Sequence, residues 1–367
     1  MAGSPLHRLS ALGQSVWVDY LSRNLLDTGE LEQMTRDDAV VGVTSNPTIF
    51  QKALAEGDAY DAQLREVLRR TQDPKEIFVA LASRDVADAC DLLLPIWEAT
   101  GGADGYVSME VDPTFAFNVE ATLDEAMRFH TELARPNLLV KIPATKAGLA
   151  AIEEMIARGH SINVTLIFSL ERYAEVAEAY VAGLERLVED GGDPSTVHSV
   201  ASFFVSRVDS EADRRLDALG GHDHLKGKLA VANAKLAYAR YREIFSGPRW
   251  EALAAAGART QRCLWASTST KNPDYRDVLY VEELIGPETV NTMPEETIRA
   301  FQDHGVAEPR LEQDVDAAHR LFDDLAKAGI DYADVSTVLE REGVEKFAAS
   351  FAELIQGIVA RREALLA

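Results

Sequence analysis

Lys141 is a cation in the middle of an apolar run, residues 137–145 (NLLVKIPAT). Such a run predicts a buried β-strand that ends at Pro143. Burial removes water from an ammonium group and favours the neutral amine, which is a nucleophile toward carbonyl carbons. The run therefore predicts a lysine that forms a Schiff base at the end of a strand. The simpler alternative is a lysine that extends its ammonium from the strand end to solvent.

Polar side chains also interrupt or follow other short apolar runs near their C-terminal ends. They are Asp19, Asn46, Glu110, Asn163, Thr165, Ser202, Arg207, Ser267, Ser269 and Lys271. Isolated charges are costly to bury, so charges in such places are expected to be paired or to have a function. In a parallel barrel the C-terminal strand ends meet at one mouth, where each can supply one group to an active site.

Three of these residues also have simple structural explanations. Asp19 could cap a following helix, and Asn46 could be a turn residue before Pro47. Thr165 is β-branched and suits a strand whether or not it has a function. Only the shared position of such residues at successive strand ends favours a functional interpretation.

Two charged residues have structural alternatives as well. Glu110 could form a purely structural ion pair with Lys141. Arg207 could lie on the surface of a helix and pair with Asp209 or Glu211. The sequence alone leaves both alternatives open.

Eight short apolar runs predict strands, at residues 15–20, 40–44, 106–111, 138–142, 162–168, 199–204, 262–267 and 289–293. Stretches rich in Ala, Leu, Glu and Arg lie between them and predict helices, at residues 74–99, 123–135, 149–158, 170–189 and 226–245. This alternation predicts a parallel sheet, and eight repeats favour a closed (β/α)8 TIM barrel over an open sheet. No glycine motif for dinucleotide or phosphate binding opens a helix, which weakens the open-sheet alternative.

The spacing of the runs is uneven. The segment 51–105 is too long for one crossover helix and is expected to hold two or three helices. Further helices are predicted at residues 294–304, 308–328 and 344–366. No linker rich in Pro, Gly or Ser divides the chain. We therefore expect a single domain over residues 1–367, in which residues 294–367 form C-terminal helices packed on the barrel.

The composition is typical of a globular protein, with 47% hydrophobic and 26% charged residues. A net charge of −23 repels nucleic acid and anionic membranes, so neither is expected as a partner. Cys90 and Cys263 lie in separate apolar stretches without a CxxC motif, which is typical of reduced core cysteines. Residues 1–12 lack the apolar core of a secretion signal, and no window approaches 18 uninterrupted apolar residues. A cytoplasmic protein is expected.

Seven segments together resemble transaldolase in its longer bacterial form. They are residues 16–23 (VWVDYLSR), 42–52 (GVTSNPTIFQK), 107–113 (VSMEVDP), 139–145 (LVKIPAT), 161–169 (SINVTLIFS), 201–209 (ASFFVSRVD) and 265–273 (WASTSTKNP). They span nearly the whole predicted barrel in order. The resemblance implies transfer of a dihydroxyacetone unit from sedoheptulose 7-phosphate to glyceraldehyde 3-phosphate, giving erythrose 4-phosphate and fructose 6-phosphate. This reaction belongs to the non-oxidative branch of the pentose phosphate pathway and uses no metal or organic cofactor.

The resemblance also implies catalytic roles for four matching residues. Lys141 would form the imine with the ketose carbonyl, and the protonated imine would act as an electron sink. Asp19 would take the proton from the C4 hydroxyl as the carbon–carbon bond breaks, and return it in the second half-reaction. Glu110 and Thr165 would hold the water molecule that moves protons while the carbinolamine becomes the imine.

Substrate-binding roles follow from the same resemblance. Asn46 and Ser202 would bind substrate hydroxyls, and Arg207 would bind the phosphate through its planar guanidinium. Shorter members of the family carry an ASFRN block after the seventh strand, with Ser and Arg on the phosphate. Here the block reads ASTSTKN, at residues 266–272, so that Ser267 or Ser269 matches the serine and Lys271 replaces the arginine.

Two other functions fit the same residues. One is an aldolase that also uses a lysine imine but releases the three-carbon unit to water, cleaving fructose 6-phosphate or a related ketose phosphate. The other is a catalytically silent barrel that binds sugar phosphates. Sugar-phosphate substrates are the only expected partners, and the chain is expected to be a monomer or a homodimer.

Overall fold

Eight parallel strands form a closed barrel in which β1 to β8 are neighbours in chain order. The computed structural model describes residues 4–55 and 57–366. The strands are β1 (Gln14–Val18), β2 (Val40–Val43), β3 (Tyr106–Glu110), β4 (Leu138–Pro143), β5 (Ile162–Ile167), β6 (Ser199–Phe204), β7 (Arg262–Ala266) and β8 (Thr289–Met293). The predicted (β/α)8 TIM barrel is therefore confirmed, and β6 and β8 have the predicted bounds.

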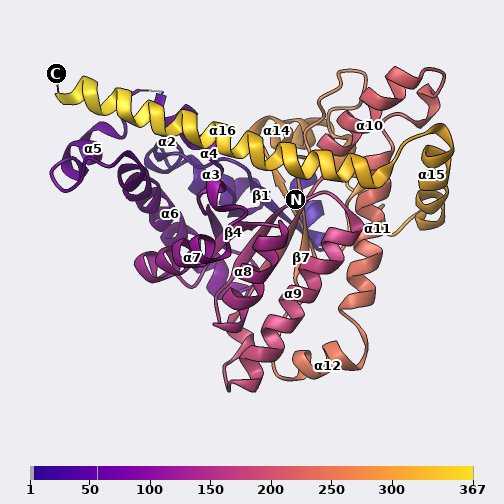
Figure 1. Cartoon of the computed structure of the whole chain (residues 1–367), viewed down its shortest axis with the longest axis horizontal. Coiled ribbons are helices and arrows are strands. Elements are labelled where there is room, and N and C mark those ends of the chain that lie inside the picture. The colour runs from indigo at the N-terminus through magenta and orange to yellow at the C-terminus, as the bar shows by residue number, and fades with distance from the viewer. Residues whose placement is uncertain (1–3, 56, 367) are drawn as a thin grey trace.

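Sixteen helices accompany the strands within the described ranges, and most of them cover the outside of the barrel (Figure 1). They are α1 (Pro5–Ala11), α2 (Arg23–Asp27), α3 (Glu30–Asp37), α4 (Pro47–Ala55), α5 (Asp61–Val67), α6 (Pro74–Ala99), α7 (Val119–Leu133), α8 (Lys146–Ala157), α9 (Leu170–Glu189), α10 (Ser206–Leu219), α11 (Leu229–Ile244), α12 (Gly247–Ala255), α13 (Leu279–Glu283), α14 (Glu295–His304), α15 (Val315–Ala328) and α16 (Tyr332–Leu366). As predicted, the segment 51–105 holds two whole helices, α5 and α6, and the end of α4.

Side-chain caps fix where several covering helices begin. Asp73, Asn118, Thr145 and Ser169 precede α6, α7, α8 and α9, and each side chain accepts a hydrogen bond from a backbone N–H of the first turn. Such caps satisfy donors that have no partner inside the helix, and each contributes about 1 kcal/mol. The caps after β3, β4 and β5 therefore set where the chain turns from each strand into its helix.

The C-terminal helices differ from the prediction in two places. The helix expected from residue 308 begins at Val315, because Pro309 disfavours a helix before it and Asp314 has a left-handed φ of 58°. The helix expected from residue 344 begins at Tyr332 and runs through Gly343. A Cβ at Gly343 would lie 3.1 Å from Leu166 Cδ2, so this glycine permits close packing and does not end the helix.

The barrel interior is polar in its middle layer. Lys141 is paired in register with Glu110 of β3 and with Asn163 of β5, which brings the three strands' side chains together. The same Asn163 accepts a hydrogen bond at Oδ1 from Ser202 Oγ of β6 (2.7 Å), and its Nδ2 donates to Ser108 Oγ of β3 (3.0 Å). Residues two apart on a strand share a face, so this chain of hydrogen bonds lies directly beneath the mouth.

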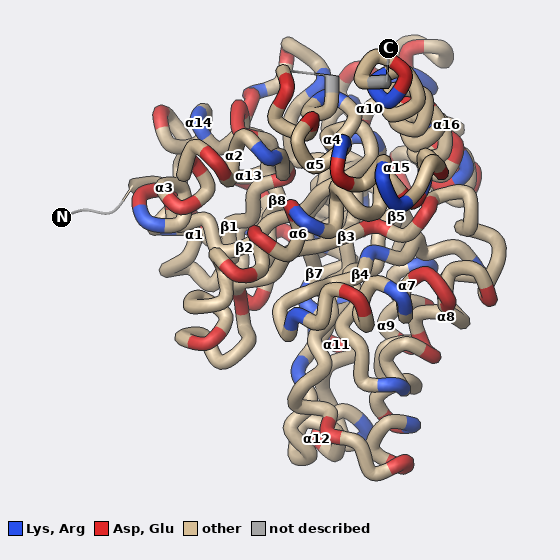
Figure 2. The backbone as a smooth tube through the Cα atoms, turned by 90° about the vertical axis from the view of Figure 1, so that its left-hand side faces the viewer, with Lys and Arg blue, Asp and Glu red and all other residues tan. Residues whose placement is uncertain are grey.

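The long helix α16 runs along one side of the molecule, above the C-terminal ends of the strands (Figure 1). Acidic and basic residues are interspersed over the outer helices, as Figure 2 shows. Within the described ranges, no helix combines the length and the apolar character that crossing a membrane requires.

Candidate active site at the carboxyl ends of the strands

A cleft of about 650 Å³ opens at the C-terminal ends of the strands. Most of the predicted site residues line it, namely Asp19, Asn46, Lys141, Thr165, Ser202, Arg207, Ser267, Ser269 and Lys271. Glu110 lies beside Lys141 and lines a small adjoining pocket of about 30 Å³. The structure therefore brings all the predicted residues to one mouth of the barrel.

Lys141 is buried, with 6% of its surface exposed. Its Nζ donates to the carbonyl oxygen of Ser45 (3.1 Å) and to Glu110 Oε2 (3.3 Å). The alternative in which this lysine extends to solvent is therefore wrong. The ammonium is held at the mouth by one carbonyl and one carboxylate.

Glu110 forms the ion pair with Lys141 that was one of its structural alternatives. Its side chain is only 6% exposed, and burial raises the pKa of this carboxyl while the Lys141 charge opposes that rise. A carboxyl with a raised pKa accepts a proton more readily than an exposed carboxylate, and here an amine lies within hydrogen-bond distance of it. The pair is thus suited to proton transfer as well as to structure.

Asp19 follows β1 and lies in the same cleft. Its Oδ1 accepts a hydrogen bond from Thr44 Oγ1 (2.7 Å), which is also 2.6 Å from Thr292 Oγ1. Burial raises the pKa of Asp19, and Lys141 is the strongest opposing influence. The capping alternative is wrong, because the side chain that caps α2 is that of Ser22.

Thr165 is fully buried on β5, and its Oγ1 has no hydrogen-bond partner within the described part of the chain. An unpaired buried hydroxyl costs about 1–3 kcal/mol, so such groups usually have a partner that binds. The next residue, Leu166, has a left-handed φ of 60°, and the register between β5 and β6 shifts between Val164 and Ile167. This local distortion lies immediately beside the free hydroxyl.

Arg207 is the second residue of α10, directly after β6. Its Cζ lies 5.1 Å from the ring centre of Phe204 and 5.9 Å from that of Phe347. Its Nη1 is buried without a hydrogen-bond partner among residues 4–55 and 57–366. Burial lowers the pKa of this guanidinium, and the charges of Asp19 and Glu110 oppose that effect.

The proposed surface partners of Arg207 are engaged elsewhere, so that alternative is wrong. Asp209 accepts hydrogen bonds from the backbone N–H of Ala230 (2.7 Å) and from Tyr280 Oη (2.9 Å). Glu211 pairs with two other arginines, Arg214 and Arg215. The guanidinium of Arg207 is therefore left facing the cleft that it lines.

The loop after β7 carries Ser267 and Ser269, either of which could match the phosphate-binding serine of the shorter family members, and Lys271, which replaces their arginine. Ser267 has a left-handed φ of 58°, and its Oγ lies 2.8 Å from Ser206 Oγ. Lys271 Nζ donates to Ser269 Oγ (2.8 Å). Both serines and the lysine line the cleft, so the structure supports a contribution from each of them.

Asn46 and Ser202 each have one side-chain atom in a hydrogen bond within the protein. Asn46 Oδ1 accepts from the backbone N–H of Ile49 (3.1 Å), so it does fix the turn into α4. Ser202 Oγ donates to Asn163 Oδ1. Asn163 was noted in the sequence as a polar strand residue but given no role, and its position two residues before Thr165 was the available signal.

Two further cations in the cleft were missed as site residues. Lys52 lies within the 42–52 segment, and Arg299 lies on α14, where it pairs with Glu295. With Lys141, Arg207 and Lys271, they give the cleft five cationic side chains in a protein of net charge −23. Since long-range repulsion is screened over about 8 Å, this local cluster can attract an anion. No group of three or more His, Cys, Asp or Glu among the described residues is placed to hold a metal ion.

A second cavity, of about 670 Å³, opens at the opposite, N-terminal end of the barrel. Its centre is Arg262, which donates to Ser15 Oγ (2.8 Å) and to Asp104 Oδ1 (3.1 Å). Asp104 also accepts from Ser15 Oγ (2.8 Å) and Trp17 Nε1 (3.2 Å). These four side chains are bonded to one another across the floor of the barrel, whereas Gln14 Oε1, which also belongs to a lining residue, has no partner among residues 4–55 and 57–366.

Comparison with known proteins identifies the family. The family described as transaldolase/fructose-6-phosphate aldolase matches residues 16–358. The chain belongs to this family. A transaldolase of Mycobacterium tuberculosis is 52% identical over 355 residues, covering 96% of this chain and 95% of the relative. A transaldolase of Acidothermus cellulolyticus is 53% identical over 366 residues, and one of Mycobacterium ulcerans is 52% identical over 364 residues, each covering 98% of both chains.

Family membership confirms the resemblance seen in the sequence and the predicted transaldolase function, a transferase activity. Members of the transaldolase/fructose-6-phosphate aldolase family act on sugar phosphates. The matched region covers every strand from β2 to β8, most of β1 and the part of α16 up to residue 358. The polar groups at the mouth therefore all lie within the part of the chain that defines the family.

Proposed function

We propose that the chain transfers a dihydroxyacetone unit from sedoheptulose 7-phosphate to glyceraldehyde 3-phosphate through an imine on Lys141. The observation that carries this proposal is the buried Lys141 ammonium, 3.3 Å from Glu110 Oε2, at the mouth of the barrel. Asp19 and the unpaired hydroxyl of Thr165 lie in the same cleft and supply the remaining groups that the chemistry needs.

Imine formation begins when the Lys141 ammonium gives a proton to Glu110, to which it is hydrogen-bonded, and the resulting neutral amine attacks the C2 carbonyl of the ketose. The resulting carbinolamine loses its hydroxyl as water, which requires a proton donor and then an acceptor. We assign both roles to Glu110, because it is hydrogen-bonded to Lys141 Nζ and burial raises its pKa, so that it accepts a proton more readily than an exposed carboxylate does. Thr165 Oγ1 binds the water that connects them, which satisfies its otherwise unpaired hydroxyl.

Carbon–carbon cleavage follows from the protonated imine. Asp19 takes the proton of the C4 hydroxyl, the C3–C4 bonding pair moves toward the imine nitrogen, and the aldehyde product leaves. The three-carbon enamine remains on Lys141. It attacks the carbonyl of the acceptor aldehyde, which regains the proton from Asp19. The raised pKa of Asp19 brings this carboxylate closer to the proton affinity that a general base needs near neutral pH.

The phosphate of either sugar binds at the cationic side of the cleft. Arg207 donates from the unpaired Nη1, and Lys271 and the hydroxyl of Ser267 complete the site. Lys271 is a point charge and lacks the planar fork of an arginine, so it binds the phosphate without a fixed bidentate geometry. Asn46 and Ser202 bind the sugar hydroxyls nearer to the imine.

Further parts of the proposal concern organisation and context. The chain forms one domain over residues 1–367, of which 1–3, 56 and 367 lie outside the described residues. It works in the cytoplasm, in the pentose phosphate pathway, as a monomer or homodimer. The strongly negative net charge supports the absence of nucleic-acid and membrane partners. The imine itself serves as the electron sink, so the proposed reaction needs no metal or organic cofactor.

Borohydride reduction in the presence of fructose 6-phosphate, followed by mass mapping, tests the proposal. Reduction of the imine leaves a stable sugar-derived adduct, which is expected on Lys141. An adduct on Lys52, Lys146 or Lys271, or no adduct at all, would overturn the assignment.

The second candidate, an aldolase that releases dihydroxyacetone, is favoured by the family description, which names both activities. Incubation with fructose 6-phosphate and erythrose 4-phosphate separates the two functions. Formation of sedoheptulose 7-phosphate is expected to exceed release of free dihydroxyacetone. A folded protein that turns over neither substrate would instead be the silent binding barrel.

A further inference from the structure

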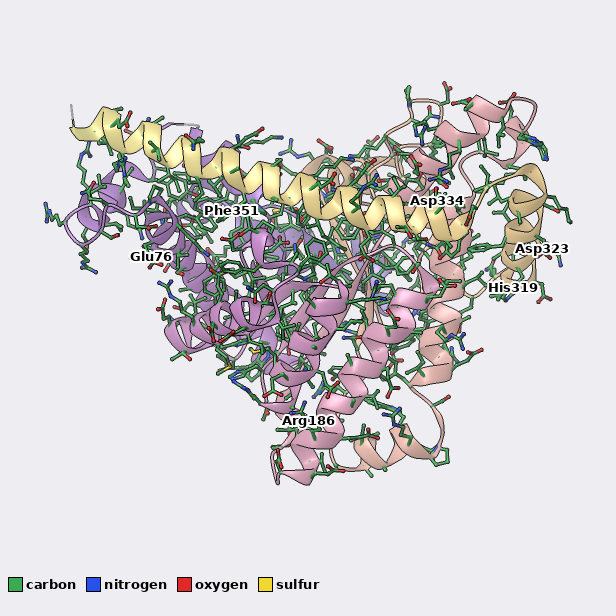
Figure 3. All side chains as sticks on the ribbon, viewed as in Figure 1. Glu76, Arg186, His319, Asp323, Asp334 and Phe351 are labelled. Carbon is green, nitrogen blue, oxygen red and sulfur yellow. The ribbon has the colours of Figure 1, made fainter. Side chains whose placement is uncertain are left out.

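The helix α16 packs closely over the C-terminal mouth of the barrel. Gly343 marks the closest approach, because a Cβ there would lie 3.1 Å from Leu166 Cδ2 and 3.3 Å from Phe168 Cε2. Residues four apart on a helix share a face, so Phe347 and Phe351 follow Gly343 along the side that faces the barrel. Figure 3 shows Phe351 on the side of α16 that faces the body of the molecule.

Phe347 is the residue on this face that reaches the candidate active site. Its ring lines the cleft, and 9% of its surface is exposed. The ring centre lies 6.0 Å from Lys141 Nζ and 5.9 Å from Arg207 Cζ. One apolar side chain thus lies beside both the cation proposed to form the imine and the cation proposed to bind phosphate.

The position of Phe347 is fixed by contacts further along α16. Phe351 packs edge-on against Phe78 of α6, with ring centres 5.5 Å apart. Thr48 Oγ1 donates to Ser350 Oγ (2.9 Å), which joins α16 to α4. These contacts after Phe347, together with the close packing at Gly343 before it, give its ring a defined place over the mouth.

The enamine left on Lys141 after cleavage has two possible fates. In transfer, its C3 carbon attacks an acceptor aldehyde. In release, C3 takes up a proton to give an iminium, water adds to C2 and gives up a proton, and the C2–N bond of the carbinolamine breaks as its hydroxyl becomes the ketone. The products are free dihydroxyacetone and the regenerated amine, so release consumes one water per enamine. Water near C2 therefore decides between the two fates.

We propose that Phe347 is a specificity-determining residue, whose ring excludes water from C2 of the enamine on Lys141 and so favours transfer over release. This inference rests on the proposed function. The ring lies within reach of the imine nitrogen but offers no proton donor or acceptor, and its neighbours on α16 are packed against the barrel. It can therefore affect water without taking part in proton transfer.

The test compares Phe347→Ala and Phe347→Leu with the unchanged protein. Two rates are measured, the formation of sedoheptulose 7-phosphate from fructose 6-phosphate and erythrose 4-phosphate, and the release of dihydroxyacetone from fructose 6-phosphate alone. Phe347→Ala is expected to raise the ratio of release to transfer by about tenfold or more. Phe347→Leu retains an apolar side chain and is expected to keep the ratio nearer to that of the unchanged protein.

Leu354→Ala is the matched control, because Leu354 is fully buried on α16 but does not line the cleft. It loosens the helix without removing the ring, and the ratio is expected to stay unchanged. An equal rise in this control, or an unchanged ratio in Phe347→Ala, would overturn the inference. Circular dichroism establishes whether each variant is folded. If the alanine variant is not, Phe347→Leu decides, because its smaller side chain should still raise the ratio by a measurable, lesser amount, and no rise at all would overturn the inference.

A second measurement separates this inference from the proposed function. Protein loaded with fructose 6-phosphate and freed of glyceraldehyde 3-phosphate is reduced with borohydride at increasing times. The trapped three-carbon adduct on Lys141 is expected to disappear faster in Phe347→Ala. If the unchanged protein forms no adduct and transfers nothing, the proposed function fails. If it does both and the adduct lifetimes agree, only the role of Phe347 fails.

Discussion

The two ends of the barrel carry cavities of nearly equal size, about 650 Å³ at the C-terminal mouth and about 670 Å³ at the N-terminal end. Each combines arginine, a carboxylate and hydroxyl groups. At the N-terminal end these groups satisfy one another, since Arg262 and Asp104 share a network with Ser15 and Trp17. Such a closed network stabilises the floor of the barrel and leaves little for a ligand to bind.

The C-terminal mouth differs in what it leaves unpaired. Thr165 Oγ1 and Arg207 Nη1 are both buried there without a partner in residues 4–55 and 57–366. The cost of such groups, about 1–3 kcal/mol each, is offset when a substrate binds them. Gln14 Oε1 at the N-terminal cavity is unpaired as well, but it belongs to a neutral amide. The comparison shows that a cavity with charges does not identify a site. Among the described residues, the C-terminal mouth differs because one of its buried, unpaired atoms belongs to a charged group, the Arg207 guanidinium.

Among substitutions at the two ends of the barrel, Lys141→Ala at the C-terminal mouth is expected to have the largest effect on turnover. Without the amine no imine forms, so turnover should fall by more than about 10⁴-fold. The variant should still fold, because the loss of the Lys141 charge removes an influence that lowers the pKa of Glu110, so this buried carboxyl can take up a proton instead of remaining an unpaired charge. Turnover and circular dichroism are the measurements, and substantial residual turnover would contradict the assignment of Lys141.

Asp19→Ala should affect one step only. The imine on Lys141 should still be trapped by borohydride, but cleavage should slow by roughly 10²–10⁴-fold, the usual contribution of a general base. Single-turnover kinetics with fructose 6-phosphate measure the cleavage step. Cleavage at the normal rate would show that Asp19 is not the base.

Arg262→Met, at the N-terminal end of the barrel, should lower the stability of the fold and leave turnover nearly unchanged. It leaves Asp104 without its ion pair, and breaking a pair of this kind lowers the free energy of unfolding by about 3–5 kcal/mol when burial is complete. Because both side chains keep about 16–17% exposure, the lower part of this range is expected. Denaturant unfolding measures the loss, while turnover per folded molecule should stay within a few-fold. A large loss of turnover in folded protein would make the N-terminal cavity functional.

Arg207→Lys should act mainly on substrate binding. Losing the guanidinium fork removes a charge-assisted hydrogen bond worth about 1.5–3 kcal/mol, so KM for fructose 6-phosphate should rise roughly 10- to 100-fold. Lys271→Met, which removes a more exposed point charge, should raise KM less. Steady-state kinetics provide the measurement, and the reverse order would place the main phosphate contact on Lys271.

Asp209 is a buried carboxyl outside the cleft whose pKa is raised although the residue has no proposed catalytic role. Burial raises its pKa to about 7, although Ala230 and Tyr280 satisfy its oxygens. The folded protein therefore holds a proton that the unfolded chain loses near the ordinary value of 3.8. The stability from protonated Asp209 is complete below about pH 4 and is lost as the pH rises through about 7.

The corresponding experiment measures the unfolding free energy of the protein and of Asp209→Asn between pH 4 and pH 8. The asparagine does not titrate, so the stability of the unchanged protein relative to the variant should fall by up to about 1.4 kcal/mol per pH unit. The fall should end near pH 7. A difference that is independent of pH would mean that Asp209 is ionised in the folded protein throughout.

The sequence predicted the parts of the molecule that local patterns determine. The apolar runs of β6 and β8 gave their bounds, and the capping serine Ser169 marks the start of α9 where it was expected. The polar residues at strand ends converged because the geometry of a parallel barrel requires it. Spacing alone therefore indicated which residues meet at the mouth, whereas their catalytic roles came from the resemblance to transaldolase and stay predictions.

Features that depend on packing between distant segments were not predictable. The helix α16 runs through Gly343 because Leu166 and Phe168 lie against that glycine, and no local pattern contains this information. The place of Phe347 beside Lys141 follows from the same packing. The free hydroxyl of Thr165 likewise depends on which neighbours the folded barrel fails to provide.

The packing of α16 also separates two properties of the mouth. Lys141 belongs to β4, whereas Phe347 belongs to a helix that contributes no strand to the barrel. In the proposed mechanism, the group that forms the imine and the ring that covers it are therefore carried by different elements. Substitutions on α16 could then shift the balance between transfer and release during evolution, while every residue that carries out proton transfer stays unchanged.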